Sequence, residues 1–162
     1  MAHPMRRTDR EIADAEQIDR LLSQARYAVV ALAEGDEPYI VTLSCGFDAA
    51  NRRLCFHVAN TGRKLDIIAR NPKACVTIIA DLGYKHGECA QPFESIVMTG
   101  TMRLLENPAE IREGMRVLIG QLEGASDAAA VFGRNQLDSD AALSRFRLLV
   151  FEIEHLTAKC GE

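Results

Sequence analysis

The pattern of apolar and polar residues predicts six β-strands. Three of them lie within residues 26–59, and the others cover residues 74–82, 93–106 and 145–156. Short polar segments rich in turn formers, 34–37 and 48–51, join the first three strands, and Gly100 marks a bulge in the fifth. Strands joined mainly by hairpins form an antiparallel sheet, and six of them close most naturally into a small closed or partly open barrel.

Segments whose apolar residues recur with a helical period lie before and between some of these strands. The predicted helices cover residues 15–25, 63–70 and 108–122, with two short helices in the alanine-rich stretch 125–133 and in 138–144. Asp14-x-x-Gln17 is a capping-box pattern at the start of the first helix. Asn107-Pro108 places a capping side chain and an N1 proline before the third. The fold class is therefore mainly β with flanking helices.

Composition and charge narrow the class of protein. The 162 residues, 48% hydrophobic and 26% charged, suit a single domain over 1–162, with an N-terminal arm at 1–14 and a helical insertion at 123–144. A net charge of −4 and a pI near 5.6 argue against a general nucleic-acid or anionic-membrane binder. No apolar run approaches the roughly 20 residues that span a bilayer, and the first residues lack the apolar stretch of a secretory signal. We therefore expect a cytoplasmic protein.

The cysteines favour reduced thiols. There are five, an odd number, and no two have the CxxC spacing of a zinc knuckle, so neither a disulfide framework nor a structural metal is expected. Cys45, Cys55 and Cys75 fall inside predicted strands, where cysteine usually acts as a small buried hydrophobe.

The stretch LCFHVANTGRKLDIIARNP, residues 54–72, changes from a strand to a helix at its middle. His57 falls on the polar face of the strand, and Arg63 and Lys64 occupy the first helical turn. Two cations at the positive end of a helix dipole are unfavourable unless an anion joins them. Exposed backbone N–H groups with a guanidinium and an ammonium suit a phosphate monoester. The alternative is that both side chains simply point into water.

Four segments in this order resemble one family. They are MRRTDREI near the start, PYIVTLSCGF, LCFHVANTGRKLDIIARNP and ECAQPFESIVMTGTMRLLE. Together they resemble the flavin-binding split-barrel family related to pyridoxamine 5'-phosphate oxidase, and within it the NimA-like 5-nitroimidazole-resistance branch. The likeness covers residues 5–122 and resumes at the last strand, while 123–144 match no known segment. The F-H-x-A-x-x-G-R-K unit is its most specific part.

The resemblance implies a six-stranded antiparallel split β-barrel that forms a homodimer with two FMN molecules at the interface. It implies that Arg63 and Lys64 hold the FMN phosphate, with help from Ser95. The strands that edge the flavin ring would contribute Thr42, Leu43 and Ser44, and Phe56, His57 and Val58. FAD in place of FMN is left open.

The expected function is that of an oxidoreductase in which FMN passes electrons, from NAD(P)H as one candidate donor, to a small electron-poor substrate such as a nitroimidazole. His57 would act as a proton donor or an orienting hydrogen bonder, although a histidine on a polar face is often only structural. Two alternatives stay open: a non-catalytic flavin-binding module, and a haem-binding or haem-degrading split barrel with His57 or His155 as axial ligand. The arginine-rich C-terminal motif of true pyridoxamine 5'-phosphate oxidases has no counterpart, so that specific activity is not expected.

Overall fold

The six predicted strands form one closed antiparallel barrel in the computed structural model, which describes residues 5–161. The ends of the chain, residues 1–4 in the predicted arm and residue 162, lie outside the described residues. The strands are β1 (Tyr27–Glu34), β2 (Glu37–Asp48), β3 (Arg53–Val58), β4 (Lys73–Asp81), β5 (Phe93–Leu104) and β6 (Arg147–Gly161). Their order around the barrel is β1-β2-β3-β6-β5-β4, and the β5–β6 register shifts between Thr99 and Gly100, which confirms the predicted bulge.

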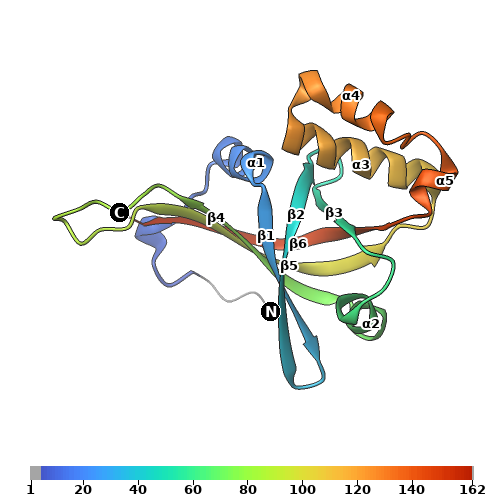
Figure 1. Cartoon of the computed structure of the whole chain (residues 1–162). Helices are drawn as coiled ribbons and strands as arrows, with labels where there is room; N and C mark the ends of the chain where they lie inside the picture. The colour runs from blue at the N-terminus through green and yellow to red at the C-terminus, as the bar shows by residue number, and fades with distance from the viewer. Residues whose placement is uncertain (1–4, 162) are drawn as a thin grey trace.

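The α-helices also follow the sequence prediction. They are α1 (Ala15–Gln24), α2 (Arg63–Arg70), α3 (Pro108–Glu123), α4 (Ala125–Arg134) and α5 (Asp140–Leu143). A 3-10 turn, η1 (Thr8–Arg10), lies within the predicted N-terminal arm and was not predicted. Figure 1 shows α3, α4 and α5 together on one side of the barrel, and the loop between β4 and β5 extending as an arm on the other. No helix within residues 5–161 is long and apolar enough to cross a membrane.

Asp14 caps α1, but the predicted capping box does not form. The Asp14 carboxylate accepts a hydrogen bond from the Glu16 N–H at 3.1 Å, and not from the Gln17 N–H that a capping box uses. The side chain of Gln17, however, does not turn back to Asp14; its amide donates to the Glu94 carboxylate at 2.6 Å. The hydrogen bond between Gln17 and Glu94 joins α1 to β5. A local sequence pattern cannot show such a contact between distant segments.

Two apolar clusters lie on opposite sides of the barrel wall. The first fills the barrel and includes Val30, Phe56, Met98 and Phe151, which are fully buried. The second lies between the outer face of β3 and β6 and the helices α3 to α5. Because of it, the outer face of β3 is covered at Cys55, which is 0% exposed and is therefore the small buried hydrophobe that the sequence predicts. Burial raises the pKa of the Cys55 thiol to about 12.

Gly46 allows α3 to reach the outer face of β2. A Cβ atom at this position would lie 2.6 Å from the Cα of Leu118 in α3, closer than non-bonded carbon atoms approach. The Gln121 side chain fixes the same contact, because it accepts from the Phe47 N–H at 2.8 Å and donates to the Ala25 carbonyl at 2.6 Å. The helix layer is therefore held against the barrel by backbone contact and by hydrogen bonds.

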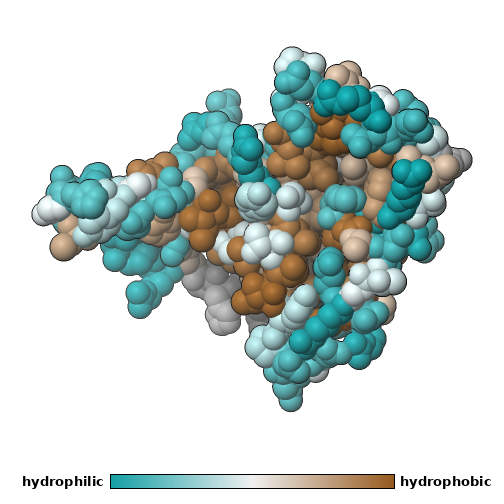
Figure 2. All heavy atoms as spheres, in the orientation of Figure 1, coloured by the Kyte–Doolittle hydropathy of each residue, from teal (hydrophilic) through white to brown (hydrophobic). Residues whose placement is uncertain are grey.

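Among residues 5–161, no helix covers the rest of the barrel's outer face. Cys75 points outward here and is exposed, contrary to the expectation that it is a buried hydrophobe. Side chains on the outside of these strands include Ile40 at 64% exposed, Ile79 at 63% and Val97 at 41%. Figure 2 shows apolar surface across the middle of the molecule, between the β4–β5 arm and the helix layer. A contiguous apolar surface on a folded chain is typical of an interaction site.

The Gly46 contact can be tested by substitution. Gly46→Ala places a methyl group against the α3 backbone, so we expect the free energy of unfolding in urea to fall by about 1–3 kcal/mol. Gly120→Ala is the matched control, because this α3 glycine has no atom within 4 Å of the added methyl. Replacing a helical glycine without a clash should raise stability by about 0.4–1 kcal/mol. Equal effects of the two substitutions would contradict the close packing of α3 on β2.

Candidate functional site

The start of α2 is open to an anion. Its N-cap is Gly62, whose φ of 139° suits glycine and whose lack of a side chain leaves the helix without a side-chain cap. The Gly62 carbonyl accepts from the Leu65 and Asp66 N–H groups, which closes the first turn. The first N–H groups of a helix have no partner within it and point along the axis. This helix start therefore offers unused donors at the positive end of a dipole.

Arg63, in the first turn of α2, is paired with carboxylates of the β1–β2 hairpin. Its Nη2 lies 2.7 Å from Glu37 Oε1 and its Nε lies 3.4 Å from Glu34 Oε2. The guanidinium also lies 4.9 Å from the centre of the Tyr39 ring. The hydrogen bond and the charge of Glu37 raise the pKa of Arg63. Lys64 is half-buried, and no ion pair links it to another described residue.

The second feature of the site is an unpaired edge of β2. Residues 37–44 pair with β1, but β2 pairs with β3 only through Cys45–Asp48. The edge of 37–44 that faces away from β1 has no strand partner among the described residues. It carries backbone N–H and C=O groups that can bind a ligand. Because Arg63 contacts Glu37, this edge begins beside the start of α2.

The predicted ring-binding residues lie at the other end of this edge. Cys45 pairs with Phe56, so the register, continued by one residue, brings Ser44 opposite His57. Thr42 and His57 are exposed and Ser44 is half-buried, all on the outer face. The side chains of the remaining three point into the barrel or pack against its core: Leu43, Phe56 and Val58. Only the backbone of those three is available to a ligand.

His57 borders a cavity under the helix layer. The cavity has a volume of about 270 Å³, and its other lining residues are Met115, Ile119, Asn135, Leu137, Ala142, Arg145 and Phe146. The His57 ring meets the Phe146 ring edge-on, with centroids 4.8 Å apart. Burial lowers the pKa of His57 below its ordinary value, because the charged imidazolium loses hydration there. His57 is therefore neutral near pH 7 and can both donate and accept a hydrogen bond.

Ser95 does not join the other predicted site residues within one chain. It is buried in β5, where it pairs with Ile79 and Lys159, and it lines a separate cavity of about 540 Å³. In the barrel order, β1 and β4 separate β5 from β2. The predicted residues thus form two groups: Thr42, Ser44, His57, Arg63 and Lys64 around the β2 edge, and Ser95, itself buried, on the part of the outer face that the helix layer leaves uncovered.

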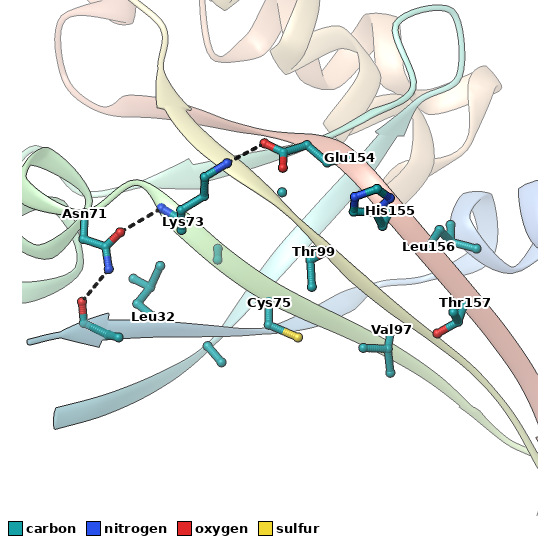
Figure 3. Close-up of a pocket in the computed structure, with 14 residues that line it drawn as sticks. Leu32, Asn71, Lys73, Cys75, Val97, Thr99, Glu154, His155, Leu156 and Thr157 are labelled. Carbon is teal, nitrogen blue, oxygen red and sulfur yellow. Dashed lines mark hydrogen bonds and ion pairs between the residues drawn. The ribbon is translucent and has the colours of Figure 1, made fainter. Parts of the chain in front are cut away.

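A larger cavity of about 760 Å³ lies on the same outer face. Figure 3 shows Cys75, Val97, Thr99, His155 and Thr157 around it, from β4, β5 and β6. At its rim, Lys73 donates to Glu154 at 2.8 Å. Hydrogen bonds from Lys73 and Thr101 lower the pKa of the Glu154 carboxyl. No group of three His, Cys, Asp or Glu side chains within residues 5–161 is placed to hold a metal ion.

Sequence reasoning missed four residues of these sites. Glu34 and Glu37 read as turn residues, and their pairing with Arg63 joins positions 26 or more apart in the sequence. Asn135 and Arg145 lie in or beside residues 123–144, in which no short motif resembles the family. The lengths of the strands could have located the open edge of β2, because a long second strand beside a short third strand must leave part of its edge unpaired.

Similar solved structures share this fold. One is described as a 5-nitroimidazole antibiotic resistance protein from Bacteroides thetaiotaomicron, with 22% identity, a TM-score of 0.75, and coverage of 93% of this chain and 86% of that one. A FAD and haem binding protein from Mycobacterium smegmatis has 18% identity, a TM-score of 0.77, and coverage of 94% and 74%. HutZ, a haem storage protein from Vibrio cholerae, has 14% identity, a TM-score of 0.62, and coverage of 90% and 94%.

A sequence match identifies the family more directly than these structures do. No curated protein sequence matches the chain. The family model described as pyridoxamine 5'-phosphate oxidase matches residues 14–159, which contain the helices α1 to α5, the strands β1 to β5 and all but the last two residues of β6. This match also includes residues 123–144, which carried no resemblance at the level of short motifs. The chain belongs to the pyridoxamine 5'-phosphate oxidase-related family of split β-barrels, as its sequence predicts.

Proposed function

We propose that this protein binds FMN along the unpaired edge of β2, with the phosphate at the start of α2. The single observation that carries the proposal is the continuity of the two features: an uncapped helix start and an open strand edge that begins beside it. A flavin needs an anion site for its phosphate and backbone groups for its polar pyrimidine edge. In this chain the anion site at the start of α2 adjoins the open backbone edge of β2, so both groups that a flavin needs lie next to each other.

The charges around Arg63 fit a phosphate only after an exchange of partners. In the described structure Glu37 and Glu34 already neutralise its guanidinium. All three side chains are at least partly exposed, and ion pairs of this kind contribute little to stability. A phosphate dianion, which also meets the helix N–H groups and Lys64, is a stronger partner for Arg63 than Glu37. FMN binding would therefore release Glu37 to water.

A homodimer would bring the two groups of predicted residues together. The bare outer face carries Ser95 and exposed apolar side chains such as Ile79 and Val97. Packing this face against a second copy would remove it from water and place Ser95 of that copy near a flavin on the first. Such an interface should bury more than about 1,000 Å².

The activity that we propose is a flavin-dependent reduction of a small electron-poor substrate, of the kind that the NimA-like branch suggests. Bound FMN supplies two-electron chemistry, with NAD(P)H as the candidate donor. The chain's part is to hold the ring on the β2 edge and to present His57 beside it. His57, neutral near pH 7, would orient the substrate by a hydrogen bond from its N–H group, which is the second of the two roles that the sequence left open for it.

Haem binding is a second candidate, favoured by His155. This histidine is exposed and faces the 760 Å³ cavity on the outer barrel face, where its imidazole is free to serve as an axial ligand (Figure 3). Two of the similar structures are named for haem binding or storage.

The absorption spectrum of the purified protein separates these candidates. We expect the two long-wavelength bands of an oxidised flavin, and FMN as the compound released on denaturation. Release of FAD would correct the identity of the cofactor and leave the ring site in place. A Soret band in place of the flavin bands would support haem and overturn the flavin proposal.

Substitution of Arg63 tests the phosphate site. Arg63→Ala should weaken FMN binding about ten- to a hundredfold, the loss expected for a hydrogen-bonded contact with a charged group. Riboflavin, which has no phosphate, should bind wild type and variant alike. Fluorescence titration of each flavin measures both constants.

Two further variants serve as controls for this site. Arg70→Ala removes an arginine from the opposite end of α2 that also contacts Glu34, and it should leave FMN affinity unchanged. Glu37→Gln removes the competing carboxylate and should tighten FMN binding. Equal weakening of FMN and riboflavin by Arg63→Ala would assign this residue to the fold or the ring pocket and refute the phosphate site.

The dimer can be tested at Val97. Val97 is 41% exposed on the bare outer face, so Val97→Glu should leave the barrel folded. In a dimer, each copy would bury an unpaired carboxylate, and we expect the dimer dissociation constant to rise by about a hundredfold or more. FMN affinity should fall with it. Analytical sedimentation measures the dimer dissociation constant. Ala130→Glu, at an exposed position of α4, is the matched control and should leave this constant unchanged. A wild-type protein that is monomeric at micromolar concentration would contradict the shared site.

A further inference from the structure

The cavity beside His57 has the composition of a binding pocket for a flat apolar molecule. Met115, Leu137 and Phe146 supply apolar walls from α3, from the α4–α5 connection and from the residue before β6. Its volume is about 270 Å³. An apolar cavity of about 150 Å³ holds one benzene ring. A single aromatic ring with one or two substituents therefore fits the space.

Arg145 gives this apolar cavity a cation. Its side chain is exposed, and it has no ion pair with another described residue. The neighbouring arginine of the helix layer behaves differently: Arg116 lies 3.3 Å from Asp138, 3.5 Å from Glu113, and over the Phe132 ring. Arg145 is thus an uncompensated guanidinium at the edge of an apolar space, a setting that suits a carboxylate.

The other polar groups of the cavity are neutral. Asn135 donates from its amide to the Val131 carbonyl at 2.8 Å, which fixes the side chain and leaves its oxygen as an acceptor. His57 contributes an imidazole that meets the Phe146 ring edge-on. None of the lining residues is acidic, so nothing in the cavity repels an anion.

We propose that this cavity is the substrate pocket and that it selects a single-ring aromatic carboxylate, with Arg145 binding the carboxylate and His57 facing the ring. The inference rests on the proposed function, because His57 also stands opposite Ser44 at the end of the β2 edge where the flavin ring would lie. It gives residues 135–146 a role that the barrel itself does not need: they close the pocket over β3.

The test compares a carboxylate with its neutral amide. The probes are 4-nitrobenzoate and 4-nitrobenzamide, titrated by calorimetry into the protein both with FMN and without flavin. Wild type should bind the carboxylate at least about tenfold more tightly. Arg145→Ala should weaken the carboxylate about ten- to a hundredfold and leave both the amide and FMN unchanged. Arg145→Lys should keep part of the affinity, since it keeps the charge but loses the planar fork.

Arg134→Ala is the matched control, because Arg134 is an exposed arginine of α4 that does not line the cavity. Equal affinity for the two probes, absence of binding, or the same loss in Arg134→Ala and Arg145→Ala would overturn the proposal. Failure of FMN to bind would instead refute the proposed function, and the titration of the flavin-free protein would still decide whether the pocket recognises carboxylates.

Discussion

The backbone contact between α3 and β2 at Gly46 divides the outside of the barrel into two different surfaces. On one side the helix layer covers β3 and β6, contributes to the second apolar cluster and forms a wall of the cavity beside His57. On the other side the strands remain bare, with Ile79 and Val97 exposed. A closed barrel has an apolar interior of its own, so the helix layer is not needed to fill it. What the layer adds is a covered face suited to a small molecule beside a bare face suited to another protein.

The difference in length between β2 and β3 accounts for the proposed cofactor site. β2 has 12 residues and β3 has 6, and the chain leaves β3 to form α2. The part of β2 that precedes Cys45, residues 37–44, therefore has no strand partner on that edge among the described residues, and the start of α2 lies beside the edge that is left open. At the start of α2, two carboxylates of the β1–β2 hairpin form ion pairs with Arg63 in the free chain. A phosphate would compete with them for the guanidinium.

The sequence predicted the elements well because each depends on local chemistry. Alternation identified every strand, Asn107-Pro108 marked the start of α3, and Gly100 marked the bulge. The resemblance to split barrels predicted the family correctly. Contacts between distant segments were not predictable from such patterns. The burial of Cys55 depends on α3, and the pairing of Arg63 with Glu37 depends on how a hairpin meets a helix.

The same limit applies to the candidate site. Arg63, Lys64 and His57 could be singled out because they stand in a specific motif, whereas Asn135 and Arg145 border His57 only through the packing of the helix layer. The grouping of Thr42, Ser44 and His57 on one outer face follows from strand register, which alternation does predict. The position of Ser95, on a strand that β1 and β4 separate from β2, required the order of the strands.

A crystal structure of the protein with FMN would test the central claim most directly. The account predicts the phosphate within hydrogen-bond distance of the α2 N–H groups and of the Arg63 guanidinium, with Glu37 released and the ring along residues 40–44 of β2. A flavin bound elsewhere, with Arg63 still paired to Glu37 and the β2 edge empty, would contradict it.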